Sequence, residues 1–168
     1  FPNFVDLRRI NSKNKSNGFF TKAKLVQELQ NGFGFTVGSE IGINAVQSTN
    51  YDGQKQRKVS SIYALAEKKI INRINISLLL RLELADEKLL PLLPMLSLNY
   101  QLKKKEKLYL SGSISKNYNL PTLNDLYWFP GGNEYLKAES GLEIEAGLHY
   151  AKTFSEIINF TLGLTAYS

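Results

Sequence analysis

Few side chains of this 168-residue sequence belong to the types that carry out chemistry in an active site. Glu143 and Glu145 stand two positions apart, so on a strand they share one face, where paired carboxylates could act as general acid and base. The sequence has a single histidine, His149, and no cysteine, which excludes disulfides and thiolate metal sites. Nothing else catalytic accompanies the two glutamates, and we interpret them as charges matched by basic residues. We therefore predict no catalytic residue, no metal site and no cofactor.

A second group of residues is suited to recognition. Tyr127, Trp128 and Phe129 are consecutive, and two glycines and Asn133 follow closely. Exposed aromatic rings beside glycines offer flat apolar area to a ligand at a small ordering cost. We name Tyr127, Trp128 and Asn133 as candidate ligand contacts. The alternative is that these rings pack the loop on itself or lie at a membrane interface, where aromatic girdles form.

The overall charge is positive, with 21 Lys and Arg against 15 Asp and Glu, a net charge of +6. A net positive charge favours binding to nucleic acid or to an anionic surface. Here the positive residues form short runs, at 55–58 and 103–107, between apolar stretches. Since no nucleic-acid-binding motif accompanies them, we predict no nucleic-acid partner.

The elements that would position these residues are β-strands, because apolar and polar residues alternate with a period of two. We predict an all-β, antiparallel up-and-down meander of about eight or nine strands. Clear alternation covers 33–44, 74–84, 96–102, 108–115, 142–150 and 158–166, and less regular strands are expected near 22–30, near 56–68 and around Phe4–Ile10. The polar segment 11–18 is predicted to be a loop.

The lengths of the connections favour a membrane barrel over a soluble one. Several strands run ten or more residues, which is about what a tilted strand needs to cross a bilayer, and no apolar run is as long as a membrane-spanning helix. Short connections at 30–32, 68–71, 103–106 and 151–155 alternate with long ones at 47–55, 85–92 and 116–140. Short turns on one side and long loops on the other are typical of outer-membrane barrels, whose apolar face is turned to lipid. The residues expected on that face include Leu96, Leu98, Leu108, Leu110, Ile144, Leu148, Phe160 and Leu162, and those expected on the lumen face Ser111, Ser113, Glu145 and Thr161.

One segment carries a resemblance to a known family. Between 113 and 150 the sequence contains Ser115-Lys116, Tyr118, Pro121-Thr122-Leu123-Asn124-Asp125-Leu126-Tyr127, Gly132-Asn133, Leu136-Lys137-Ala138-Glu139 and Glu145-Ala146-Gly147-Leu148-His149-Tyr150. This order of residues resembles the barrel signature of TonB-dependent receptors. The segment departs from it at Asn119, where the family often has Arg, and at Glu134 and Ala138, where it often has Pro.

The resemblance implies a transporter and not an enzyme. A complete receptor of this family is a barrel of about 22 strands around a plug. Loops and plug bind a nutrient from outside, such as a siderophore, a vitamin, a glycan or a peptide, and the TonB complex drives its passage. We expect residues 1–168 to be a barrel fragment from the middle to later part, without the plug domain, located in the cell outer membrane. Its expected partners are outer-membrane lipid and lipopolysaccharide, its own plug, the TonB complex and an unknown nutrient.

Two other interpretations remain open at this point. The chain length also fits a complete small outer-membrane barrel of eight strands. It fits a soluble lipocalin-like carrier too, which would turn the apolar faces inward. The receptor-like loop argues against the first, and the alternating loop lengths argue against the second.

Overall fold

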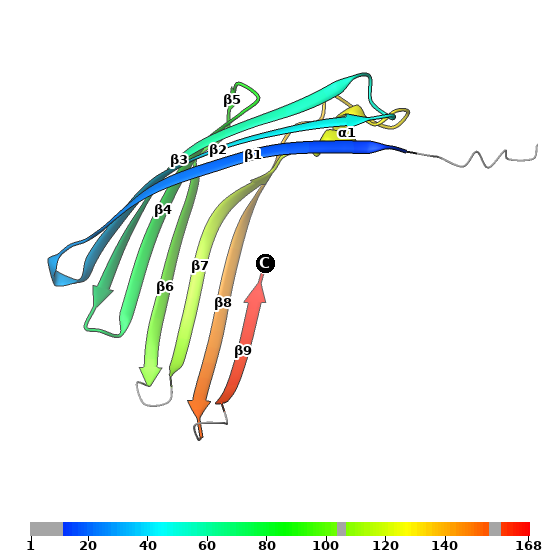
Figure 1. The fold of residues 1–168 in the computed structure, drawn as a ribbon. Coiled ribbons are helices and arrows are strands. Elements are labelled where there is room, and N and C mark those ends of the chain that lie inside the picture. Colours follow the sequence, from blue (N-terminus) through cyan, green and yellow to red (C-terminus); the bar gives the residue numbers. More distant parts are fainter. Residues whose placement is uncertain (1–11, 104–106, 155–158) are drawn as a thin grey trace, which may run out of the picture.

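The computed structural model describes residues 12–103, 107–154 and 159–168, and Figure 1 shows them as one curved sheet. No helix in these ranges is long and apolar enough to cross a membrane. The predicted strand around Phe4–Ile10 lies outside the described residues. The elements in chain order are β1 (Asn14–Glu28), the 3-10 turn η1 (Gln30–Gly32), β2 (Phe33–Ser48), β3 (Gln54–Ile70), β4 (Ile74–Ala85), β5 (Lys88–Leu89), β6 (Leu93–Lys103), β7 (Leu108–Asn119), α1 (Leu123–Tyr127), β8 (Glu139–Thr153) and β9 (Asn159–Tyr167).

The strands form a simple meander. Their order in the sheet is β1-β2-β3-β4-β6-β7-β8-β9, with the two-residue β5 paired to β4, and every pairing is antiparallel. The predicted fold class is therefore confirmed. The described sheet is open, with β1 and β9 at its edges (Figure 1).

The structure corrects several predicted boundaries. The segment 11–18 is not a loop throughout, because β1 begins at Asn14, which pairs with Ser48 on β2. The predicted connection 47–55 is shorter in the structure and covers 49–53, because β2 continues to Ser48 and β3 begins at Gln54. The connection 116–140 shortens to 120–138 and contains helix α1. Cross-strand backbone hydrogen bonds can continue a strand beyond the point where its apolar and polar side chains stop alternating. Strand ends predicted from the alternation therefore fall short of the strand ends in the structure.

The apolar face of the sheet is exposed. Among the described residues only Ala85 and Leu123 are buried apolar side chains. The residues predicted to share a lipid-facing side do share one face, because Leu96 pairs with Ile114 and through it with Ile144, and Leu110 pairs with Leu148. Leu110 is 43% exposed and Ile144 is 49% exposed. This arrangement is the opposite of a soluble barrel, which packs its apolar face inside.

The polar side chains lie on the less exposed face of the curved sheet, which we call the inner face. On it Arg81 of β4 reaches across β3 to Glu40 of β2, with 2.7 Å between Nη2 and Oε2. Tyr63 is the cross-strand partner of Gly38, and its ring lies over that glycine. A Cβ atom at position 38 would come within 2.3 Å of Tyr63 Cζ. The glycine thus provides the space that the tyrosine ring occupies.

We expect Gly38→Ala to destabilise the folded protein by about 1–3 kcal/mol, because the added methyl group displaces the Tyr63 ring. Gly34→Ala is the matched control, since its nearest neighbour would be the Gln27 carbonyl oxygen at 3.9 Å. The measurement is the apparent unfolding temperature of both variants in detergent micelles. Equal temperatures for the two variants would contradict the role assigned to Gly38.

Candidate functional site

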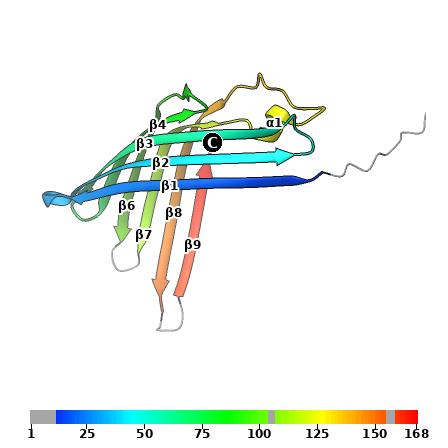
Figure 2. The ribbon, with the colours of Figure 1, turned by 45° about the horizontal axis from the view of Figure 1, so that its top comes forward.

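The three connections predicted to be long meet at one end of the sheet. These are 49–53 between β2 and β3, 86–92 between β4 and β6, and 120–138 between β7 and β8. Figures 1 and 2 show β5 and α1 at this end and the tight turns at the other. We call the three connections the loop rim. Their common side was predicted from the alternation of loop lengths, although 49–53 has five residues, no more than the connection 154–158 between β8 and β9.

Helix α1 gives the longest connection its shape. Thr122 caps the helix: its hydroxyl accepts a hydrogen bond from the Asp125 N–H at 3.1 Å, and its own N–H donates to the Asp125 carboxylate at 2.8 Å. Hydrogen bonding of the Asp125 carboxylate, first to the Thr122 backbone N–H and then to the Thr122 side chain, holds the pKa of Asp125 below its usual value. The reciprocal pair is a capping box, and the spacing Thr-x-x-Asp was the signal from which sequence reasoning could have found the helix.

The first half of the long connection is attached to the end of the β2–β3 hairpin. The Tyr51 hydroxyl donates a hydrogen bond to Asn124 Oδ1, and the Phe129 N–H donates to the Asn50 carbonyl at 2.9 Å. The rings of Tyr51 and Tyr127 meet edge to face with 6.4 Å between centroids. Burial raises the pKa of the Tyr51 hydroxyl. Sequence reasoning missed Tyr51, since nothing in its local sequence indicates a partner more than 70 residues away.

Arg57 joins two parts of the loop rim. Its Nη1 donates to the Pro121 carbonyl at 2.6 Å, and its Nε lies 3.4 Å from the Asp86 carboxylate. The other oxygen of Asp86 accepts a hydrogen bond from the Lys58 N–H at 2.8 Å. Arg57 is thus a structural link between connections 86–92 and 120–138. Sequence analysis had placed it within a basic run only.

The three predicted contact residues differ in environment. Tyr127 is half-buried, and Lys55 Nζ lies 4.4 Å from its ring centroid. Trp128 is also half-buried, directly after α1. Asn133 is exposed; its N–H donates to the Asp125 carbonyl at 2.8 Å, and its side chain accepts from the Tyr135 N–H at 3.0 Å. All three residues therefore lie in connection 120–138. Tyr127 is anchored there by its contacts with Tyr51 and Lys55.

The most exposed aromatic residues of the loop rim are others. Phe129 is 78% exposed and Tyr135 is 90% exposed. Phe129 belongs to the aromatic run noted in the sequence, whereas Tyr135 was not singled out there. The second half of the connection, 130–138, is exposed throughout, and its aromatic surface is open to a ligand.

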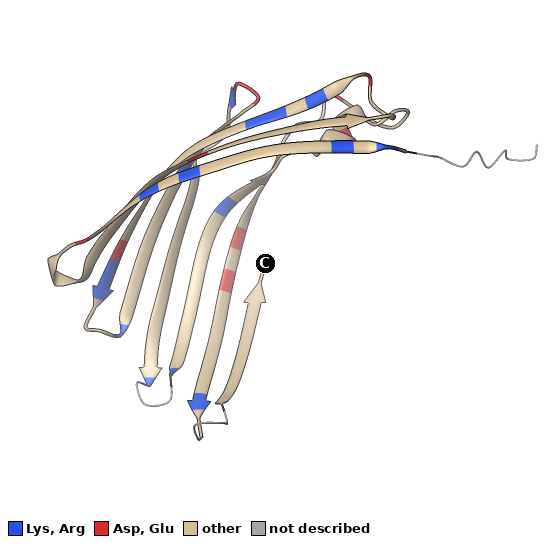
Figure 3. Ribbon diagram, viewed as in Figure 1, with Lys and Arg blue, Asp and Glu red and all other residues tan. Residues whose placement is uncertain are grey.

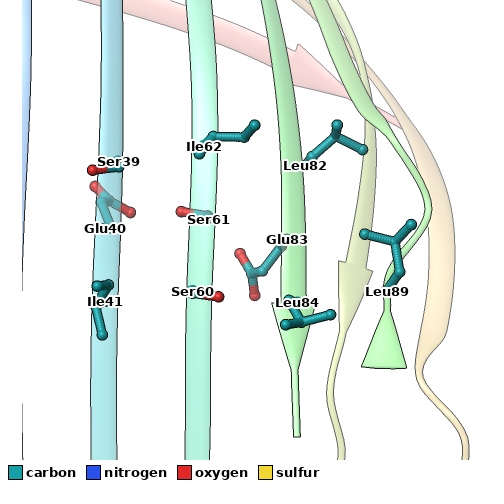
Figure 4. Close-up of a pocket in the computed structure, with 10 residues that line it drawn as sticks. All are labelled: Ser39, Glu40, Ile41, Ser60, Ser61, Ile62, Leu82, Glu83, Leu84 and Leu89. Atoms are coloured by element: carbon teal, nitrogen blue, oxygen red, sulfur yellow. The ribbon is translucent and has the colours of Figure 1, made fainter. Parts of the chain in front are cut away.

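Below the loop rim, the inner face carries a charged cluster. Figure 4 shows Glu40, Ser61 and Glu83 on three adjacent strands, and Arg81 pairs with both glutamates, at 2.7 Å and 3.2 Å. Arg81 and Glu83 are thus paired charges on this face, whereas Arg73 lies in the turn before β4. Ser61 is buried at 5% exposure.

The glutamates that first suggested acid–base chemistry lie on the same inner face. Glu143 accepts a hydrogen bond from the Asn117 amide, and Glu145 is the cross-strand partner of Ser113. The His149 ring nitrogen Nε2 lies 3.3 Å from Ser111 Oγ. Within the described ranges, no group of three or more His, Asp or Glu side chains could hold a metal ion. This arrangement is a polar wall built from hydroxyl, amide and carboxylate groups.

Comparisons with known proteins agree with this geometry. The family model described as TonB dependent receptor-like, beta-barrel, matches residues 2–168. The siderophore receptor PirA from Pseudomonas aeruginosa superposes with a TM-score of 0.72 at 18% identity, over 93% of this chain and 31% of that protein. The siderophore receptor PirA from Acinetobacter baumannii gives a TM-score of 0.66 at 18% identity, over 93% of this chain and 27% of that protein.

The chain spans less than a third of the length of these two solved structures. No curated protein matches its sequence. The family match extends over nearly the whole chain, and the structure is the open antiparallel meander that part of such a barrel would form. The chain therefore belongs to the TonB-dependent receptor family and forms part of its β-barrel.

Proposed function

We propose that this chain is part of an outer-membrane receptor that imports a nutrient with energy delivered by the TonB complex. The observation that carries the proposal is the family match over residues 2–168. Such a receptor moves its ligand and makes or breaks no bond, so it is not an enzyme. The plug domain and the remaining strands then lie outside residues 1–168, consistent with the small share of the solved receptors that this chain covers.

The dimensions of the apolar face support a place in a bilayer. Lys58 and Lys68 lie on the same face of β3, since they pair with Ile43 and Phe33 of β2. They are ten positions apart, which is about 33 Å along a strand and about 25 Å along the membrane normal at a tilt of about 40°. That height is the usual height of the apolar band of an outer-membrane barrel. Lys68 Nζ also lies 3.7 Å from the centroid of the Phe33 ring, an arrangement suited to the membrane interface.

The loop rim then lies outside the cell and takes part in ligand capture. We assign the contacts to Tyr127, Trp128 and Asn133, and the exposure of Phe129 and Tyr135 extends this surface. The anchored first half of connection 120–138 holds the exposed second half in place, which reduces the ordering cost of binding. Siderophores are the nutrient class to test first, because both solved structures are siderophore receptors.

The test of this function is uptake by cells that express the complete receptor. We expect accumulation of a radiolabelled ferric siderophore from a panel of catecholates and hydroxamates. A protonophore should abolish accumulation and leave surface binding intact, because only passage requires energy. Binding without energy-dependent accumulation across the whole panel would contradict a siderophore transporter.

A second prediction concerns the capture surface. In the complete receptor, Trp128→Ala and Asn133→Ala should each weaken ligand binding about tenfold with little change in the unfolding temperature, because the one side-chain hydrogen bond lost, from the Tyr135 N–H to Asn133, lies within the exposed half of the connection. Tyr127→Ala should also lower the unfolding temperature, because its ring packs on Tyr51, whereas Tyr127→Phe should not. Lost stability with unchanged affinity for Trp128→Ala and Asn133→Ala would show the connection to be scaffold.

A third prediction concerns the two faces of the barrel. Leu110→Lys should cost about 2–4 kcal/mol if the residue lies near the bilayer midplane, because it places a charge in lipid. Ser113→Lys is the control on the inner face, where the new ammonium group would meet Glu145 across the strands. The measurement is urea unfolding of the complete receptor in lipid bilayers. Equal costs at the two positions would be inconsistent with the assigned faces.

A further inference from the structure

A cavity lies between helix α1 and the inner face of β1, β2 and β3 at the loop rim, and we call it the α1 cavity. Its volume is about 420 Å³, and ligand pockets usually have about 300–1,000 Å³. The polar residues that line it are Asn14 on β1, Asn44 on β2, Arg57 on β3, Tyr51 in the hairpin, and Thr122 and Asn124 at α1. Tyr127, Trp128 and Asn133 do not line it, so it is distinct from the ligand contacts assigned above.

The three carboxamides of the α1 cavity are open to a ligand. Asn14, Asn44 and Asn124 are exposed, and Asn44 pairs on β1 with Gly18, which has no side chain to cover it. In all three the Oδ1 atom already accepts a hydrogen bond from a neighbouring hydroxyl group: Ser12 to Asn14, Ser16 to Asn44 and Tyr51 to Asn124. Their amide nitrogens donate to no other group among the described residues. The cavity therefore offers hydrogen-bond donors in excess, which require acceptor atoms on the ligand.

These donors come without an unpaired charge. Of the described residues that line the α1 cavity only Arg57 is charged, and its guanidinium group is paired with Asp86. The single charged residue of β2 is Glu40, and Figure 3 shows no charged segment on the end of β2 at the loop rim. The nearby ammonium group of Lys55 lies over the Tyr127 ring. An anion in the cavity would lose its hydration and gain no free cation in return.

Apolar residues complete the lining of the α1 cavity. Val46 on β2 and Leu120 and Leu123 beside α1 contribute carbon surface, and Leu123 is buried. A few converging polar groups beside apolar surface are the usual composition of a site for a small molecule. The hydrogen bond from Tyr51 to Asn124 fixes one wall of the cavity to the other, which lowers the ordering cost of binding.

We propose that the α1 cavity binds an uncharged arm of the imported nutrient through carbonyl oxygens, as in an amide or peptide, and that the receptor consequently prefers neutral ligands to anionic ones. Carbonyl oxygens only accept, so they match the free amide N–H groups of Asn14, Asn44 and Asn124. A hydroxyl group would fit less well, because the carboxamide oxygens already accept from the protein. This inference rests on the proposed import function, since it identifies the chemistry of the ligand that the loop rim captures.

The test uses the complete receptor and two probes of similar size. One is a neutral ferric trihydroxamate built on a cyclic peptide, and the other is a ferric tris-catecholate, which is a trianion. Asn44→Leu and Asn44→Asp each remove the amide donor while nearly keeping the size of the side chain. Asn17→Leu is the matched control, since Asn17 lies on the outer face of β1, where it pairs with Ala45. Titration calorimetry gives the affinities, and thermal unfolding of each variant shows that it is folded.

We expect the unchanged receptor to bind the neutral probe about tenfold more tightly than the trianion. Both Asn44 variants should bind the neutral probe about tenfold more weakly, because a hydrogen bond is lost, and Asn17→Leu should bind as the unchanged receptor does. Tighter binding of the trianion, no binding of the neutral probe, or full neutral-probe affinity in folded Asn44 variants would overturn the proposal.

Uptake by cells separates this result from failure of the transport function. Energy-dependent uptake of the catecholate that Asn44→Leu leaves unchanged, together with no binding of the neutral probe, would contradict the assignment of the α1 cavity and leave the transport function standing. Neutral-probe binding that depends on Asn44, without energy-dependent uptake of any probe, would support the cavity and contradict the transport function alone.

Discussion

The backbone hydrogen-bond ladder between consecutive strands is the interaction on which this structure depends. Only two apolar side chains are buried among the described residues, so hydrophobic burial within the chain contributes little to its stability. In a bilayer the backbone groups find no water, and pairing with the adjacent strand is the means of satisfying them. Because side chains alternate along each strand, the register of the ladder also decides which residues share a face.

That alternation produces two surfaces of different chemistry from one sheet. The outer face is apolar over the height of a bilayer and becomes polar beyond Phe19 and Ile43. The inner face carries the Arg81, Glu40 and Glu83 cluster and a series of hydroxyl and amide groups, including the short contact of 2.6 Å between Ser77 Oγ and Ser97 Oγ. A charge on the inner face has polar partners, whereas the same charge on the outer face would meet hydrocarbon.

The segment that resembles the family signature anchors the longest connection. The Pro121 carbonyl accepts from Arg57, Thr122 and Asp125 close the capping box, and Asn124 accepts from Tyr51. Leu123, beside them, is one of the two buried apolar residues. These contacts give a physical reason for the residue types found there. They fix the first half of the connection to the β2–β3 hairpin and leave residues 130–138 exposed.

The sequence by itself determined the strands, their antiparallel order, the shared faces and the side on which the long connections lie. These properties follow from local alternation and from connection length, which a single chain displays directly. Only the tertiary structure decided the partners at the loop rim. Arg57 meets Pro121 across 64 positions, and Tyr51 meets Asn124 across 73, through strand pairings that bring distant segments together. The true start of β1 was also decided there, because Asn14 is held by its ladder partner Ser48 and not by any pattern of its own.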